Sequence, residues 1–178
     1  MLRQRTTTLL IALAALAAPA AVRRAEAQAP SLQGVFQLNT RASEDVNRAI
    51  DNAVSRMNFI VRPIARGRLR KTNVPYRRVT ISHTQSQVSV TTDARAAIVT
   101  PGNGSPIKWT RPEDNEKLNV STEWEAGRLK QTFQAEDGRR VNVWSISGDG
   151  RTLTMEATIT SPRLPRPLVY HLVYDRVS

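Results

Sequence analysis

The chain has 178 residues, no cysteine and a formal net charge of +11 at pH 7. Without cysteine it can form no disulfide, carry no lipid on an N-terminal cysteine and use no thiol nucleophile. Its length is sufficient for one domain that buries roughly 70% of the surface of the unfolded chain.

The first 27 residues have the pattern of a signal peptide. Arg3 and Arg5 give a charged start, residues 9–22 carry no charge, and Ala-Glu-Ala at 25–27 matches a signal peptidase site. The apolar run is too short, and too rich in alanine and proline, for a membrane span. We therefore expect export to the periplasm or the cell exterior, with a mature domain over residues 28–178. An organelle transit peptide is the alternative, because the segment is rich in arginine and nearly free of acids.

A short strand and a helical region come next. Residues 34–38, Gly-Val-Phe-Gln-Leu, alternate between two faces and predict a strand. Ser43 stands where a helix cap is needed. Apolar residues recur at three- and four-residue spacing from Val46 to Ile60, which predicts an amphipathic helix of about 18 residues. Pro63 breaks this helix and can open a second short one that reaches Leu69.

The positive charge is concentrated in and after this helical region. Residues 52–92 contain no Asp or Glu and hold eight basic residues. Five of them follow or form the second helix: Arg62, Arg66, Arg68, Arg70 and Lys71. Such a patch attracts an anionic membrane surface or ligand head group. The scarcity of aromatic residues disfavours nucleic acid. The alternative is a solvated face that only keeps the protein soluble.

Short alternating runs fill the chain from residue 78 to its end. We expect nine strands here in addition to the first one. Between 117 and 160, three turns end at Gly127, Gly138 and Gly150, where glycine accepts a positive φ. Residues 141–146 are partly apolar on both faces, so their orientation stays open. One helical region cannot cover so many strands, and open edges invite aggregation. The sequence therefore predicts a mainly β fold, a closed antiparallel up-and-down barrel of about 8–10 strands with a helix or helix pair after the first strand.

Two segments carry a resemblance to a known family. Residues 34–38 resemble the Gly-x-Trp-x-Leu of the first strand of fatty-acid-binding proteins, with phenylalanine in place of tryptophan. Tyr174-Asp175-Arg176 resembles the end of their last strand. The chain is thus similar to the calycins, the lipocalin and fatty-acid-binding-protein barrels, which implies a lid of two helices and an internal ligand. The family's arginine two residues before that tyrosine is Leu172 here, so its carboxylate clamp is not implied.

Six inward-facing residues are candidates for lining a ligand cavity: Trp124, Gln131, Phe133, Met155, Tyr170 and Tyr174. Gln131 favours a cavity, because a polar residue on an apolar face needs a partner. A filled interior is equally consistent, since small barrels are filled by their own side chains. The leading hypothesis is an exported monomer that binds a small, largely apolar or amphipathic anionic ligand, and we expect the basic residues near the mouth of the barrel. The alternative is a filled barrel that serves as an adhesion or scaffold module through its basic patch.

Catalytic and metal-binding motifs do not stand out. The chain lacks a Gly-x-Ser-x-Gly elbow, a His-Glu-x-x-His motif and a glycine-rich phosphate loop. His83 and His171 have no ligand-type neighbours at metal spacing, and the acidic residues of 113–116 lack the pattern of a calcium loop. We therefore expect no cofactor, no metal and no enzymatic activity. A lipocalin-type isomerase is the alternative.

Overall fold

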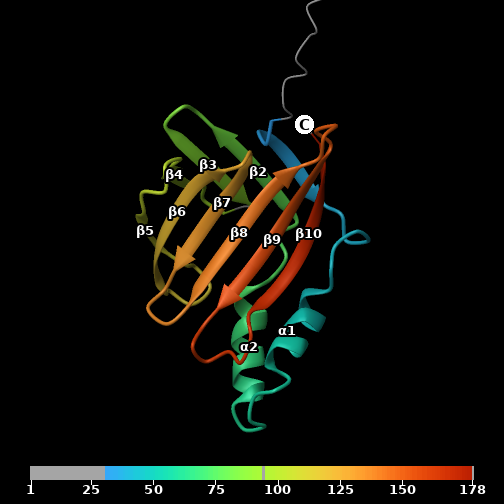
Figure 1. The fold of residues 1–178 in the computed structure, drawn as a ribbon, viewed down its shortest axis with the longest axis vertical. Helices are drawn as coiled ribbons and strands as arrows, with labels where there is room; N and C mark the ends of the chain where they lie inside the picture. Colours follow the sequence, from blue (N-terminus) through green and yellow to red (C-terminus); the bar gives the residue numbers. More distant parts are fainter. Residues whose placement is uncertain (1–30, 94, 178) are drawn as a thin grey trace, which may run out of the picture.

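The computed structural model describes residues 31–93 and 95–177, so the predicted signal peptide lies outside the described residues. Ten antiparallel strands form one sheet that curls into a nearly closed barrel, and two helices lie together at one end of it (Figure 1). This confirms the predicted mainly β barrel with a helix pair after the first strand. Within the described residues, no helix has the length and apolar character that a membrane crossing requires.

The strands follow one another around the barrel in almost the order of the sequence. Strand β1 (Gly34–Leu38) precedes helices α1 (Val46–Val54) and α2 (Arg62–Thr72). The remaining strands are β2 (Arg78–His83), β3 (Gln87–Thr92), β4 (Ile98–Pro101), β5 (Ile107–Thr110), β6 (Lys117–Glu125), β7 (Arg128–Gln134), β8 (Arg139–Ile146), β9 (Thr152–Thr160) and β10 (Leu168–Arg176).

Pairing of β1 with β10 joins the first strand to the last, which leaves β4 and β5 as the two edges of the sheet. A bridge between Asn103 and Glu123 brings the segment after β4 against β6. The N–H of Gly104 donates to the carbonyl of Thr122 at 2.9 Å in the same place. The edges are therefore tied at one point, although β4 and β5 do not pair.

Helix α1 is half as long as the apolar periodicity predicted, with nine residues. Its cap is Asp45, whose carboxylate accepts two backbone N–H groups of the first turn at 2.9 and 3.3 Å. The predicted cap, Ser43, is wrong: its hydroxyl accepts from the N–H of Val173 at 2.9 Å and so joins the chain to β10. Two residues of the types preferred at a cap, Ser43 and Asp45, precede the helix, and only their tertiary neighbours decide which one caps it.

The segment between the helices exposes apolar residues that the periodicity placed on the buried face. The chain leaves α1 after Val54, and the side chain of Asn58 accepts the N–H of Ile60 at 2.9 Å in a turn. Ile60 is therefore 65% exposed, and Phe59 is 76% exposed. Helix α2 then begins at Arg62 and runs to Thr72, which is longer than predicted, and none of its residues is fully buried.

Inward-facing residues of neighbouring strands line up in rows across β6 to β10, and three of these rows lead from the core to the helical end. The deepest of the three, here the apolar row, consists of Leu129, Trp144, Met155 and Leu172. The next, the polar row, consists of Thr122, Gln131, Asn142, Ala157 and Tyr170. The third, the mouth row, consists of Val120, Phe133, Arg140, Ile159 and Leu168. The orientation that the sequence left open is now resolved, since Asn142 and Trp144 point inward.

The turns of the predicted meander differ in conformation. Ala126 and Gly127 both have positive φ, 49° and 77°, and form a two-residue hairpin between β6 and β7. A residue with a side chain is strained at φ 49°. Ala126 adopts this conformation because a two-residue hairpin needs positive φ at both of its central residues. Gly150 also has positive φ, as predicted, whereas Gly138 does not. The four-residue loop at Gly138 instead closes with the Ala135 N–H donating to the Gly138 carbonyl at 2.8 Å.

Candidate functional site

A pocket of about 510 Å³ lies at the helical end of the barrel, between α2 and the ends of β6 to β9. Its apolar lining comes from both sides, with Met57, Val61 and Leu69 from the helical region and Phe133, Ile159 and Leu164 from the barrel. Sites for small molecules usually measure about 300–1,000 Å³ and are mostly apolar. The pocket therefore has the size and character of a site for a small lipophilic molecule.

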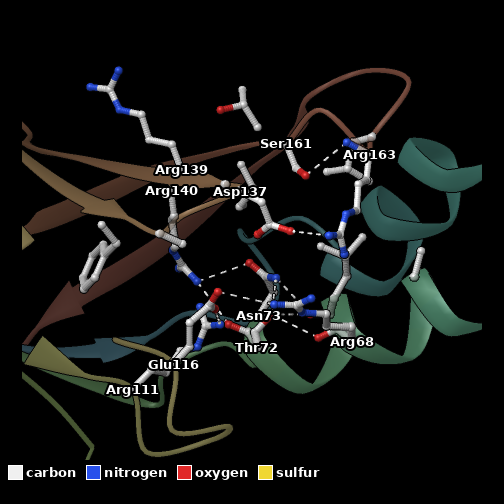
Figure 2. Close-up of a pocket in the computed structure, with 18 of the residues that line it drawn as sticks. Arg68, Thr72, Asn73, Arg111, Glu116, Asp137, Arg139, Arg140, Ser161 and Arg163 are labelled. Atoms are coloured by element: carbon white, nitrogen blue, oxygen red, sulfur yellow. Dashed lines mark hydrogen bonds and ion pairs between the residues drawn. The ribbon is translucent and has the colours of Figure 1, made fainter. Parts of the chain in front are cut away.

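Arg140 of β8 is a charged residue on the barrel side of this pocket, and Figure 2 shows it beside Asn73. Its Nε donates to Asn142 Oδ1 at 2.8 Å, and its Nη1 donates to Asn73 Oδ1 at 3.2 Å and to the Thr72 carbonyl at 3.4 Å. All three acceptors are neutral. Among the described residues, none of the ion pairs involves Arg140. A cation therefore lines a mostly apolar pocket without an ion pair of its own, since the two carboxylates that also line the pocket, Glu116 and Asp137, pair with other arginines.

Two tyrosines enclose the guanidinium of Arg140. Its central carbon lies 5.9 Å from the ring centre of Tyr76 and 6.0 Å from that of Tyr170. The Tyr170 hydroxyl donates to Asn73 Oδ1 at 3.2 Å. Burial raises the pKa of Tyr170 by more than the neighbouring Arg140 lowers it, so the phenol keeps its proton at neutral pH. The surroundings of Arg140 thus orient its charge without neutralising it.

Ion pairs surround the mouth of the pocket, and we call them the rim (Figure 2). Arg163, in the link before β10, pairs with Asp137 in the turn before β8 at 3.0 Å. Arg68 of α2 pairs with Glu116, just before β6, at 3.4 Å. The side chains of Arg163 and Arg68 are 74% and 54% exposed. Exposed ion pairs contribute about 0–1 kcal/mol each, so the rim can open at little cost.

Arg111 stabilises the loop on one side of the rim. Its guanidinium donates to both carboxylate oxygens of Asp114 at 2.8 Å and also pairs with Glu116. The hydrogen bond from Arg111 holds the pKa of Asp114 below its usual value. The acidic residues that the sequence grouped at 113–116 therefore bind arginines in this structure, and within the described residues no group of three or more His, Asp or Glu could hold a metal ion.

The barrel interior contains polar atoms that no described residue satisfies. Five such atoms lie on inward-facing, fully buried side chains: Thr100 Oγ1, Thr122 Oγ1, Gln131 Nε2, Trp144 Nε1 and Tyr174 OH. Each unsatisfied buried group costs about 1–3 kcal/mol. Together they would cost about as much as the whole stability of a typical domain, about 5–15 kcal/mol. Buried polar groups of this kind are normally satisfied by ordered water or a ligand. The interior is therefore suited to polar atoms beyond those of the chain.

Three of the six predicted ligand-lining residues lie in or next to the pocket. Phe133 belongs to its lining, on the mouth row. Gln131 and Tyr170 lie one row deeper, in the polar row, and are 2% and 1% exposed. The alternation along the strands therefore predicted correctly that these three side chains face inward, although only Phe133 lines the pocket itself.

The other three lie elsewhere. Met155 and Tyr174 are fully buried in the packed core, beyond the polar row. Trp124 is 41% exposed and contacts His83 edge-on, with the ring centres 5.1 Å apart. At Trp124, strand β6 extends beyond the packed interior of the barrel. The alternation along β6 still places this side chain on the inner face, but the residues there do not fully cover it. Trp124 lies outside the pocket.

The five predicted surface-contact residues all lie in α2, one side of which lines the pocket. Arg68 is part of the pocket lining. Arg66 and Arg70 both pair with Asp51 of α1, at 2.8 and 3.3 Å. Arg62 donates to the Met57 carbonyl at 2.7 Å. Asp51 precedes the acid-free segment by one residue, so the sequence count overlooked the carboxylate that partly balances α2.

Arg140 is the central residue that the sequence analysis missed. The predicted strand began at 141, two residues after the observed start of β8, and both of its faces looked partly apolar. Spacing by two places Arg140, Asn142 and Trp144 on one face, and this is a pattern that could have found it. An arginine at a strand start is usually exposed, so only the register showed that this one points into the barrel.

The comparison with solved structures supports the fold alone. The chain superposes on human cRBP IV with a TM-score of 0.52 and 17% identity, covering 83% of this chain and 98% of that one. For a heat soluble (SAHS) protein from Ramazzottius varieornatus, the TM-score is 0.56 and the identity 11%, covering 82% and 94%. For a fatty-acid-binding protein from Drosophila melanogaster, the values are 0.52 and 13%, covering 82% and 99%. The calycin-like resemblance is thus confirmed at the level of fold. No family model and no curated protein matches the sequence.

Proposed function

We propose that this protein is an exported, non-enzymatic carrier of a small amphipathic anionic ligand. The charged group of the ligand binds at Arg140, and its apolar part lies against the underside of α2. The observation that carries this proposal is a guanidinium without a carboxylate partner at the floor of an apolar pocket of about 510 Å³. The signal-peptide pattern supports export, and the names of the similar folds, which include a fatty-acid-binding protein, support a lipophilic ligand.

Electrostatics favour a charged ligand over a neutral one at this position. A half-buried cation loses part of its hydration, and a partner of opposite charge compensates for this loss more strongly than neutral acceptors do. The neutral acceptors Asn73 and Asn142 orient Arg140 but supply no charge. A carboxylate or phosphate ester can accept two parallel N–H groups from one guanidinium, which makes the bond directional as well as strong.

Two experiments test the proposal. Native mass spectrometry of the mildly purified protein should show a bound lipid-like mass. Displacement of an anionic apolar dye should then show that dodecanoate binds more tightly than dodecanol. Replacing Arg140 by glutamine should weaken dodecanoate about 10- to 100-fold and leave dodecanol nearly unchanged, because a partly buried charge pair is lost. Arg128→Gln, an exposed change of the same charge at the other end of β7, is the control. A protein with no bound lipid and no dye displacement would refute the carrier proposal.

A second candidate is contact with an anionic membrane surface at the tip of the helical region. Three large apolar side chains are exposed to solvent there: Phe59 is 76% exposed, Ile60 65% and Ile64 72%. They flank Arg62 and precede the other basic residues of α2. Exposed apolar residues beside arginines match the interface of a bilayer with anionic head groups. The filled adhesion module remains the alternative if the protein binds an anionic surface but no ligand.

A further inference from the structure

The polar row follows directly behind the floor of the pocket. Along β7 and β8, Gln131 and Asn142 are each two residues beyond Phe133 and Arg140, which line the pocket. Two residues along a strand correspond to about 6.5–7 Å, and the side chains face the same way. Gln131 and Asn142 are paired across the strands, and Thr122 continues the row on β6. The row is therefore one short step deeper than the charge of Arg140.

Two hydrogen-bonding groups of this row have no partner among the described residues. They are Gln131 Nε2 and Thr122 Oγ1, on side chains that are 2% and 0% exposed. Gln131 offers a donor, and a threonine hydroxyl can donate or accept. Ala157, which follows Asn142 in the row, is small and takes little space. The row thus offers both hydrogen-bond polarities at a fully buried site.

Arg140 connects the row to the pocket. Its Nε donates to Asn142 Oδ1 at 2.8 Å, so one guanidinium faces the pocket and contacts the polar row at once. A bare carboxylate on Arg140 would leave Gln131 and Thr122 unsatisfied. A head group with a further hydroxyl could reach them from the same place.

From this geometry, and resting on the proposed function, we propose that the polar row is a second subsite that selects the head group of the ligand. It binds a hydroxyl carried beside the anionic group, so the preferred ligand is an amphiphile with a hydroxyl-substituted head, such as an acylated hydroxy amino acid. The charged group binds Arg140, and the added polar group binds Gln131 and Thr122. The apolar chain extends outward under α2.

A matched pair of ligands tests this subsite. N-dodecanoyl-serine and N-dodecanoyl-alanine have the same chain and charge and differ by one hydroxyl next to the carboxylate. Calorimetric titration of the wild-type protein should show about three- to tenfold tighter binding of the serine compound, the effect of one net hydrogen bond. In the Gln131→Met, Thr122→Val double variant this preference should disappear, while the affinity for the alanine compound stays within about twofold of wild type.

The outcomes separate the two proposals. Equal binding of both compounds to the wild type would overturn the subsite and leave the carrier proposal standing. No binding of either compound, or of dodecanoate, would overturn both. A serine preference that persists in the double variant would place the hydroxyl elsewhere and refute the role of the row. The wild-type comparison needs no variant, so it holds even if the double variant does not fold. Arg140→Gln should weaken both compounds equally and keep their ratio.

Discussion

The two ends of the barrel use the same alternating strands for opposite purposes. Away from the helices, Trp144, Leu153 and Met155 are completely buried and pack into one core. At the helical end, Arg140 has no carboxylate partner and Phe59 is 76% exposed. The first end packs its apolar side chains against one another, and the second leaves a charge and apolar side chains for something outside the chain. Stability and binding are therefore separated along the barrel axis, and three changes test this separation.

The largest effect is expected in the core. Met155→Ala should lower the free energy of unfolding by about 2–5 kcal/mol, because it leaves a cavity among fully buried neighbours. Affinity for dodecanoate, measured below the unfolding transition, should change little. Phe133→Ala in the pocket lining should do the reverse, with a smaller loss of stability and weaker binding. Urea titrations of both variants decide the question. If Met155→Ala is nearly neutral for stability and alters binding, the core end is not a packed core.

A smaller effect is expected for surface binding at the helical end. Replacing Arg66, Arg68 and Arg70 by glutamine should weaken binding to anionic vesicles more than about thirtyfold at low salt, since each charge near a membrane contributes about 1 kcal/mol. Stability should barely change, because exposed ion pairs contribute little. Vesicle co-sedimentation measures the binding.

The control for this triple variant removes the same charge from exposed positions outside α2: Arg41, Arg128 and Arg151. It should bind vesicles nearly like the wild type. If both triple variants lose binding equally, net charge rather than the helical end is responsible. If the wild type does not bind vesicles, the basic residues form a solvated face.

The smallest effect concerns pH at the rim. The Arg111 guanidinium lowers the pKa of Asp114 in the folded protein, so Asp114 stabilises the fold above the unfolded pKa of about 4. This contribution is lost as the pH falls through the lower pKa of the folded state. Asp114→Asn should therefore be about 1 kcal/mol less stable at pH 7 and match the wild type near pH 2. Thermal unfolding at both pH values measures it, and a gap that persists at pH 2 would contradict this explanation.

Local patterns were sufficient for the barrel and insufficient at its helical end. Alternation with a period of two is repeated in every strand, so the number of strands and the closure could be predicted. The helix phase failed after Val54, because a turn at Asn58 interrupts the period and exposes Ile60. Ser43 was preferred to Asp45 as the cap because a sequence does not show that β10 engages the serine.

The sequence by itself determined which side chains face inward on most strands, because successive side chains point to opposite faces of a strand and the apolar ones mark the inner face. It placed Phe133, Gln131 and Tyr170 correctly on the inner face. Only the tertiary structure decided that the interior is packed at one end and open at the other. That depends on how far each strand reaches and on where α2 lies across the mouth, which no single segment specifies. For the same reason Trp124 lies outside, and Arg140 became the charge at the centre of the site, because its position depends on the register of β8 against both of its neighbours.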